Sequence, residues 1–150
     1  MRTRNGSAAA AVCIGLATFG TTLTLGFSAS AQSTRSTWDA VYTTEQAARG
    51  EPLYARMCAR CHADDLTGEG HAPALAGADF NAAWNNRPVS EFFDKIMGTM
   101  PPTAPGRLGP EETADLVAFI LSKGAYPAGA TELPATKEAL QTIKFLATKP

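Results

Sequence analysis

The sequence has no excess of charge of either sign and no long basic stretch. Its 13 Lys and Arg residues and 14 Asp and Glu residues are interspersed along 150 residues, for a formal net charge of −1. Binding to a nucleic-acid backbone needs a basic patch or stripe, so this composition argues against a nucleic-acid partner. With 45% hydrophobic and 18% charged residues, it also argues against a long disordered chain or a polytopic membrane protein and indicates one globular domain.

Cysteine and histidine are scarce as well. Three cysteines are too few for a disulfide framework, and the chain has two histidines. Cys58 and Cys61 are three positions apart, and His62 follows directly, whereas Cys13 lies in an apolar N-terminal run. The cluster from Cys58 to His62 is therefore the candidate functional site.

The N-terminus has the pattern of a secretory signal peptide. Arg2 and Arg4 precede an apolar run from about residue 8 to 27, and small residues lead to Ala31. We expect cleavage after Ala31, a periplasmic location and no membrane span in the mature chain. The alternative is an uncleaved membrane anchor, because the run approaches the ~20 residues that span a bilayer. An oxidising compartment would join two lone thiols unless another group uses them.

Three segments of the remaining chain have helical periodicity, and none alternates with period two over a useful length, which predicts an all-α fold. The first segment opens with Thr43 and Gln46 at the spacing of a capping box. Pro52 removes a backbone donor from this segment and predicts a kink near residues 50–52. Small or apolar residues form one stripe along it: Ala47, Gly50, Tyr54 and Met57.

The second segment is expected to begin with Ser90 as its N-cap and to stop at Gly98. The third has Gly109 and Pro110 as cap and first helical residue and ends at Lys123 and Gly124. Residues 63–80 and 98–109 are predicted to be irregular and are poor in bulky side chains. Loops of that length are uncommon in a compact domain, so we expect a large non-protein group to supply part of the core.

The Cys58-Ala-Arg-Cys61-His62 pentapeptide admits three interpretations. A structural zinc site needs four ligands, and outside this motif only His71 is available. A thioredoxin-type redox pair sits after a strand in an α/β pattern, whereas these cysteines end a helical segment. Covalent attachment of one haem needs two thiols for thioether bonds and a histidine ligand for iron, and this is the c-type haem signature. The motif favours haem c.

The second axial ligand of the iron must come from elsewhere in the chain, and Met100 is the candidate. The prolines that follow it restrict the backbone and would aim its thioether sulfur. Met97 fits the buried stripe of the second helix, Met57 adjoins an attachment cysteine, and His71 is close in sequence to His62. His71 stays open as an alternative ligand.

With these motifs, the chain resembles class I cytochromes c over nearly its whole mature length. The resemblance implies an all-α fold of short helices wrapped around one covalently bound haem. It also implies a cytochrome c domain over residues 32–124 and a C-terminal extension, residues 125–150, that packs on it. The matching features are Gly50 and Tyr54, the Cys58 to His62 motif, Pro73, the Met100-Pro101 loop, Leu116 and Phe119.

The resemblance also implies roles for single residues. The first and last helices of the family cross where a glycine allows close approach. The residues that would make that contact are Gly50, Tyr54, Leu116 and Phe119. The carbonyl of Pro73 would accept the second ring N–H of His62. Trp84 would donate its indole N–H to a haem propionate, although a plain core position is an equally good interpretation.

Flanking motifs narrow the resemblance further, to small cytochromes associated with quinoprotein (PQQ-dependent) dehydrogenases. They imply an electron carrier, not an enzyme, which accepts electrons from such a dehydrogenase and passes them to a terminal oxidase or another cytochrome. The alternatives are a haem enzyme or gas sensor with an open sixth position, and a bound dehydrogenase subunit. The motifs are Trp38-Asp-Ala-Val-Tyr42, Gln46-Ala-Ala-Arg-Gly50, Tyr126-Pro-Ala-Gly129 and Glu132-Leu-Pro134.

Overall fold

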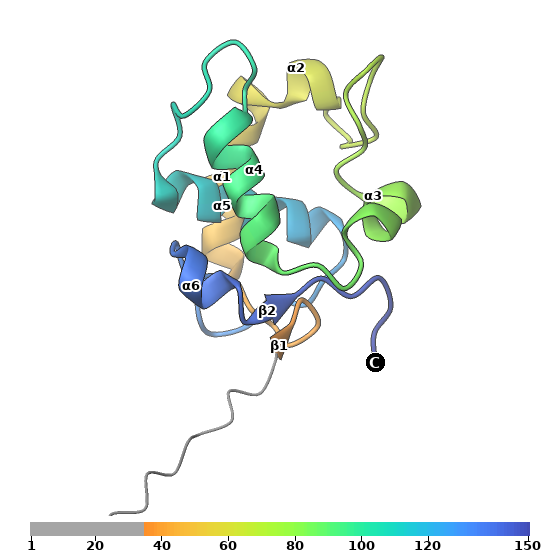
Figure 1. The fold of residues 1–150 in the computed structure, drawn as a ribbon, viewed down its shortest axis with the longest axis vertical. Helices are drawn as coiled ribbons and strands as arrows, with labels where there is room; N and C mark the ends of the chain where they lie inside the picture. The colour runs from red at the N-terminus through yellow and green to blue at the C-terminus, as the bar shows by residue number, and fades with distance from the viewer. Residues whose placement is uncertain (1–34) are drawn as a thin grey trace, which may run out of the picture. The chain divides into compact units, whose positions relative to one another are not determined.

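The computed structural model describes residues 35–150, and the predicted signal peptide with its cleavage site lies outside this range. The described part is mostly helical, which confirms the all-α prediction (Figure 1). Within residues 35–150 no helix is both long and apolar enough to cross a membrane. The elements are β1 (Arg35–Ser36), α1 (Thr44–Met57), α2 (Ala59–His62), α3 (Gly77–Trp84), α4 (Val89–Thr99), α5 (Pro110–Lys123), α6 (Lys137–Leu140) and β2 (Ile143–Lys144).

Helices α1 and α5 cross at Gly50. A Cβ atom on Gly50 would lie 2.1 Å from the carbonyl oxygen of Asp115 and 2.8 Å from the Cβ of Phe119. One turn further along α1, the rings of Tyr54 and Phe119 pack with their centroids 5.2 Å apart. The expected crossing of the two helices at a glycine is confirmed. It fixes the end of α1, from which the chain continues into the cysteine motif.

The ends of α1 and α5 follow from local chemistry. The Thr43 hydroxyl accepts a hydrogen bond from the backbone N–H of Gln46 at 3.1 Å, as the capping-box spacing predicts. Helix α1 continues through Pro52 to Met57, so this proline does not end the helix. At the start of α5, the Glu112 carboxylate accepts from the backbone N–H of Gly109 at 3.1 Å.

Helices α3 and α4 differ from the sequence prediction. Helix α4 begins at Val89 after Pro88, whose φ of −67° and ψ of 144° give the extended conformation of a cap residue. Ser90 therefore lies inside the helix, where it is buried, and its assignment as N-cap is wrong. Helix α3 starts within the stretch predicted to be irregular. The sequence shows no sign of this helix, because only Phe80 of its eight residues is buried and no apolar stripe marks it.

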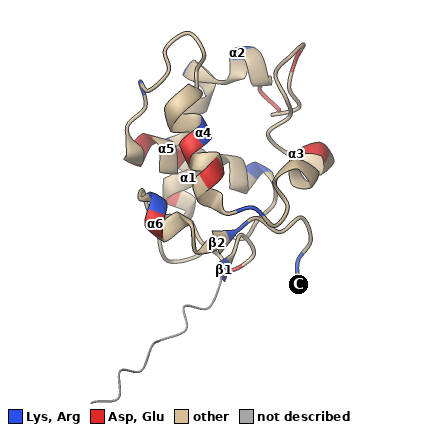
Figure 2. Cartoon of the chain, in the orientation of Figure 1, with Lys and Arg blue, Asp and Glu red and all other residues tan. Residues whose placement is uncertain are grey.

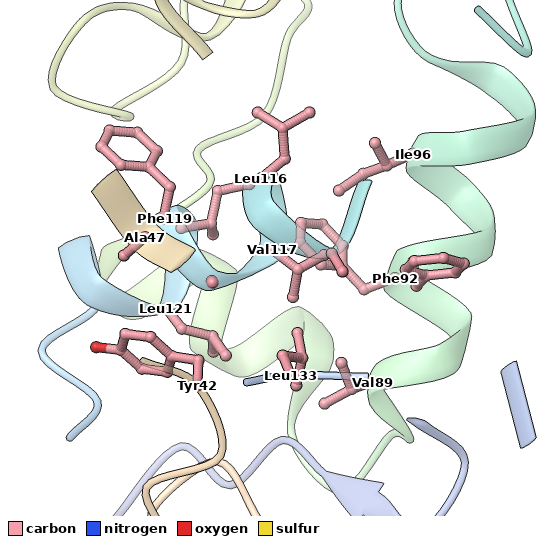
Figure 3. Packing of buried hydrophobic residues seen from close by; sticks show 14 of the residues in the cluster. Tyr42, Ala47, Val89, Phe92, Ile96, Leu116, Val117, Phe119, Leu121 and Leu133 are labelled. Carbon is pink, nitrogen blue, oxygen red and sulfur yellow. The ribbon is translucent and has the colours of Figure 1, made fainter. Parts of the chain in front are cut away.

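The core lies between α4 and α5 and extends to the C-terminal residues. Ile96 of α4 and Val117 of α5 lie in the layer between these two helices (Figure 3). Strand β2 pairs in parallel with β1, Arg35 opposite Ile143 and Ser36 opposite Lys144. The C-terminal residues buried in this core are Tyr126, Leu133, Leu140, Ile143 and Phe145.

Replacement of Gly50 with alanine should lower the free energy of unfolding by about 3 kcal/mol, at the upper end of overpacking costs, because the new methyl group meets backbone atoms that cannot rotate away. Denaturant unfolding of the haem-loaded protein measures this change. Ala48→Ser, on the exposed face of the same helix, is the control and should cost only about 0.5 kcal/mol. Equal stability of the Gly50→Ala variant and the parent protein would contradict the close crossing.

Candidate functional site

The cysteine motif forms one turn at the end of α1. Cys58 is the C-cap of α1, and α2 continues at once from Ala59 to His62. The backbone N–H groups of Cys61 and His62 both donate to the carbonyl oxygen of Cys58, at 3.0 and 2.9 Å. Cys58 is half-buried, Cys61 is exposed, and neither is in a disulfide. The two thiols are thus held one helical turn apart and are free to bond to another group.

The environment of Cys58 does not favour a thiol redox pair. Burial, with a smaller effect of the neighbouring Cys61, raises the pKa of the Cys58 thiol to about 11. Redox-active cysteines of the thioredoxin type have lowered pKa values, because the thiolate is the reactive form. The structure also holds no group of three or more His, Cys, Asp or Glu side chains placed to bind a metal ion within residues 35–150. The described residues thus provide no zinc ligand set.

The ring of His62 is oriented by the loop that precedes α3. Its Nδ1 atom lies 2.8 Å from the carbonyl oxygen of Pro73. A carbonyl oxygen only accepts hydrogen bonds, so Nδ1 carries a proton, and in a neutral imidazole the free lone pair is then on Nε2. A neutral imidazole with this tautomer and a fixed ring is what an iron ligand requires.

The backbone of His62 is held from the side of α1. The Tyr54 hydroxyl donates to the carbonyl oxygen of Ala63 at 2.6 Å and lies 3.3 Å from that of His62. The backbone N–H of Gly68 donates to the His62 carbonyl at 3.0 Å. Burial raises the pKa of the Tyr54 hydroxyl, so it stays a donor at neutral pH. The sequence marked Tyr54 for the helix crossing only, because nothing in its spacing reveals where the hydroxyl points.

Met100 belongs to a different element. It is the C-cap of α4, with extended backbone angles, and its N–H donates to the carbonyl of Ile96 at 3.0 Å. Its side chain is half-buried, as is that of Met97 one turn earlier. Helix α2 and the C-terminal end of α4 both lie toward the top of Figure 1. His71 is exposed in the loop before α3.

Trp84 lies at the end of α3 in a group of aromatic side chains. Its ring contacts Phe92 of α4 with centroids 4.8 Å apart, and the Arg87 guanidinium lies 4.3 Å from its ring centre. Arg87 also forms a salt bridge with Glu91 at 2.6 Å. These contacts place Trp84 at the edge of the core, and its expected bond to a propionate stays a prediction.

Eight apolar side chains of the elements that carry the candidate ligands are available to line a bound group. They are half-buried although they pack against the core, and they come from the end of α1, α2, the loop before α3, α3 and the end of α4. The same elements carry the candidate ligands. The side chains are Met57, Cys58, Ala59, Leu75, Ala76, Trp84, Met97 and Met100. With two free thiols and an oriented imidazole, this donor set fits a covalently held haem.

Comparison with known proteins agrees with this site. The family described as "Cytochrome C oxidase, cbb3-type, subunit III" matches residues 45–120, which contain the cysteine motif and Met100. The chain belongs to this family of cytochrome c domains. Membership implies covalently bound haem c and a function in electron transfer. The match covers α1 to most of α5 and ends before the C-terminal residues of the chain.

A chain in the crystal structure of the sulfane dehydrogenase SoxCD from Paracoccus pantotrophus is similar to this cytochrome c domain. The sequence identity is 25% and the TM-score 0.49, over 71% of this chain and 61% of the other. The protein thus spans about three fifths of the length of that chain. No curated protein matches the sequence.

Replacement of Tyr54 with phenylalanine should lower the free energy of unfolding by about 1 kcal/mol, because the Ala63 carbonyl loses its donor. The ring contact with Phe119 is kept, so the helix crossing should persist. Denaturant unfolding of the variant measures this difference. Unchanged stability would show that water replaces the Tyr54 hydroxyl without loss.

Proposed function

We propose that the protein is a monohaem electron carrier of the periplasm. Cys58 and Cys61 would hold one haem c through thioether bonds, and His62 and Met100 would ligate its iron. The haem supplies an iron that alternates between ferric and ferrous states. The chain holds this iron, excludes other ligands from it and keeps the surroundings in place while single electrons pass.

The orientation of His62 carries this proposal. Its Nδ1 donates to Pro73 at 2.8 Å, and its backbone is fixed by Tyr54, so Nε2 is presented without a change of rotamer or tautomer. Ligands fixed in this way need little rearrangement when the charge of the metal changes, as fast electron transfer requires. A second protein ligand would leave no place for a substrate or dioxygen. Ligation by Met100 together with histidine would raise the reduction potential.

The localisation and the domain limits rest on the sequence. A charged start, an apolar run and a small-residue cleavage site support a signal peptide over residues 1–31. The cytochrome c domain then covers residues 32–124, and residues 125–150 form an extension. In support of this division, the family match ends at residue 120.

The proposed electron donor is a quinoprotein dehydrogenase, and a terminal oxidase or another cytochrome is the acceptor. This proposal rests on the flanking motifs, which pack against each other. The rings of Trp38 and Tyr126 lie 4.9 Å apart, and the Tyr42 hydroxyl donates to the carbonyl of Tyr126 at 2.7 Å. Co-purification of a stable complex would indicate a bound subunit instead of a free carrier.

The charges near the site favour a partner surface with both signs. Arg56 and Arg60 are exposed, and neither forms a salt bridge within residues 35–150. Residues 63–86 contain no Lys or Arg, and Figure 2 shows acidic positions along this loop and on α3. The four acidic residues are Asp64, Asp65, Glu69 and Asp79. Complementary charges steer the encounter of redox partners more than they add affinity.

Replacement of Met100 with alanine should abolish the far-red charge-transfer band between methionine sulfur and ferric iron. The ferrous variant should then bind carbon monoxide readily, because the sixth position is open. Absorption spectra of both redox states measure these changes in the haem-loaded protein. The matched control is Met97→Ala, one turn earlier on the same helix, which should keep the band.

A parent protein that lacks the band and binds carbon monoxide would contradict the carrier proposal. It would favour the alternative of a haem enzyme or gas sensor with an open or labile sixth position. Loss of the band in Met97→Ala alone would assign the ligand to Met97. Persistence of the band in both variants would exclude both methionines.

Replacement of Cys58 or Cys61 with alanine should leave the chain poorly folded, because the haem supplies apolar volume that the helices lack. Circular dichroism should show reduced helix content and no cooperative melting. The parent protein should keep its pigment after denaturation and acid-acetone extraction. A haem-free variant with native helix content and a cooperative transition would contradict this dependence.

A further inference from the structure

Helix α3 is weakly held by its own residues. Of its eight residues only Phe80 is buried, and its N-cap, Ala76, provides no side-chain hydrogen bond. The helix nevertheless carries Trp84, a half-buried side chain that packs against the core and that the family resemblance assigns to a haem propionate. Something beyond α3 must therefore fix its position.

The connection from α3 to α4 is fixed by residues 143–147, here named the C-terminal strap. The N–H of Phe145 donates to the carbonyl of Arg87 at 2.9 Å, and the N–H of Asn86 donates to the carbonyl of Phe145 at 2.8 Å. The N–H of Ala147 donates to the Asn85 side-chain oxygen at 2.9 Å. An isolated antiparallel bridge joins Pro88 to Lys144. The entire connection, residues 85–88, thus pairs with the strap.

Phe145 also fills the space between the two helices. Its side chain is 1% exposed. Its ring centroid lies 5.7 Å from that of Phe80 and 6.1 Å from that of Trp84, both on α3. The ring of Phe92 on α4 lies 5.8 Å away. Phe145 therefore contacts the one buried residue of α3, the tryptophan at its end and the adjacent helix.

The other edge of the strap is attached to the N-terminal segment of the domain. The indole N–H of Trp38 donates to the carbonyl of Leu146 at 2.9 Å, and the N–H of Leu146 lies 3.3 Å from the Thr37 hydroxyl. Strand β2 pairs with β1 at the start of the strap. The strap is thus held by parts of the fold that are independent of α3.

We propose that the C-terminal strap holds α3 as a side wall of the haem site, with Phe145 as the positioning residue. This inference rests on the proposed function. The strap lies beyond the family match, which ends at residue 120. Because the wall limits the access of water to the haem, its position tunes the reduction potential. Water stabilises the more highly charged ferric form, so a loosened wall lowers the potential.

The test uses the full haem-loaded protein with Phe145→Ala, and with Phe145→Leu as a milder variant that keeps part of the ring volume. Backbone amide hydrogen exchange in α3 should accelerate roughly tenfold in Phe145→Ala, equivalent to about 1.4 kcal/mol. At a fixed electrode potential, the ratio of ferric to ferrous protein should rise roughly threefold. The Phe145→Leu variant should change both quantities in the same direction by less.

The matched control is Leu121→Ala, which removes an equally buried side chain of α5 near Tyr42 (Figure 3). It should lower the unfolding temperature but leave the exchange of α3 and the potential at the parent values. Equal effects of the control and the Phe145 variants would show that general destabilisation is responsible and would overturn the proposal. Unchanged exchange of α3 in both Phe145 variants would do the same.

Different results would contradict the proposed function and the proposed role of the C-terminal strap. A parent protein without covalent haem, or without the methionine charge-transfer band, contradicts the proposed function. A parent with both features whose Phe145 variants keep the potential and the α3 exchange unchanged contradicts the strap alone.

Discussion

The close approach of α1 and α5 at Gly50 is the contact on which the candidate site depends. A side chain there would meet the backbone of Asp115, so the two helices can lie at this distance only with a hydrogen atom at that position. Four residues later, Tyr54 packs on Phe119 and extends its hydroxyl to the carbonyl of Ala63. The position of α1 at the crossing therefore also fixes the turn that carries Cys58, Cys61 and His62. The position of the histidine is a consequence of helix packing as much as of the motif itself.

The remaining sides of the site are built from elements that contribute little to the protein core. The loop before α3, α3 itself and the end of α4 present half-buried apolar side chains, and Leu66 and Phe80 are the residues that anchor the loop and α3 in the core. A haem would bury the others, so folding and haem attachment should be linked in this chain. Helix α3 packs weakly on the core, and the C-terminal residues hold it in place by pairing with the connection between α3 and α4.

The sequence predicted the parts whose stability is local or periodic. The cap at Thr43 and the start of α5 at Gly109 each leave a pattern that can be read from residue types and spacing, whereas the glycine crossing was implied by the resemblance to class I cytochromes c. Helix α3 could not be predicted, because a helix with one buried residue has no apolar stripe. Phe145 was missed for a related reason: its partners Phe80 and Phe92 are more than 50 positions away, and no local rule links them. The cysteine motif was evident from spacing, whereas the hydroxyl contact of Tyr54 depends on a side-chain direction that spacing does not encode.

Hydrogen bonds orient one of the two proposed iron ligands, His62, whereas the side chain of the other, Met100, depends on packing. The imidazole of His62 is fixed by a hydrogen bond to Pro73, and its backbone by Tyr54 and Gly68, so its orientation has several independent supports. Met100 has a backbone bond to Ile96, but its side chain has three rotatable bonds and a thioether that depends on packing for its direction. Packing at the end of α4 is in turn completed by half-buried neighbours such as Met97. Any loosening of the surrounding helices should therefore release the methionine side before the histidine side, which makes Met100 the sensitive reporter of the integrity of the site.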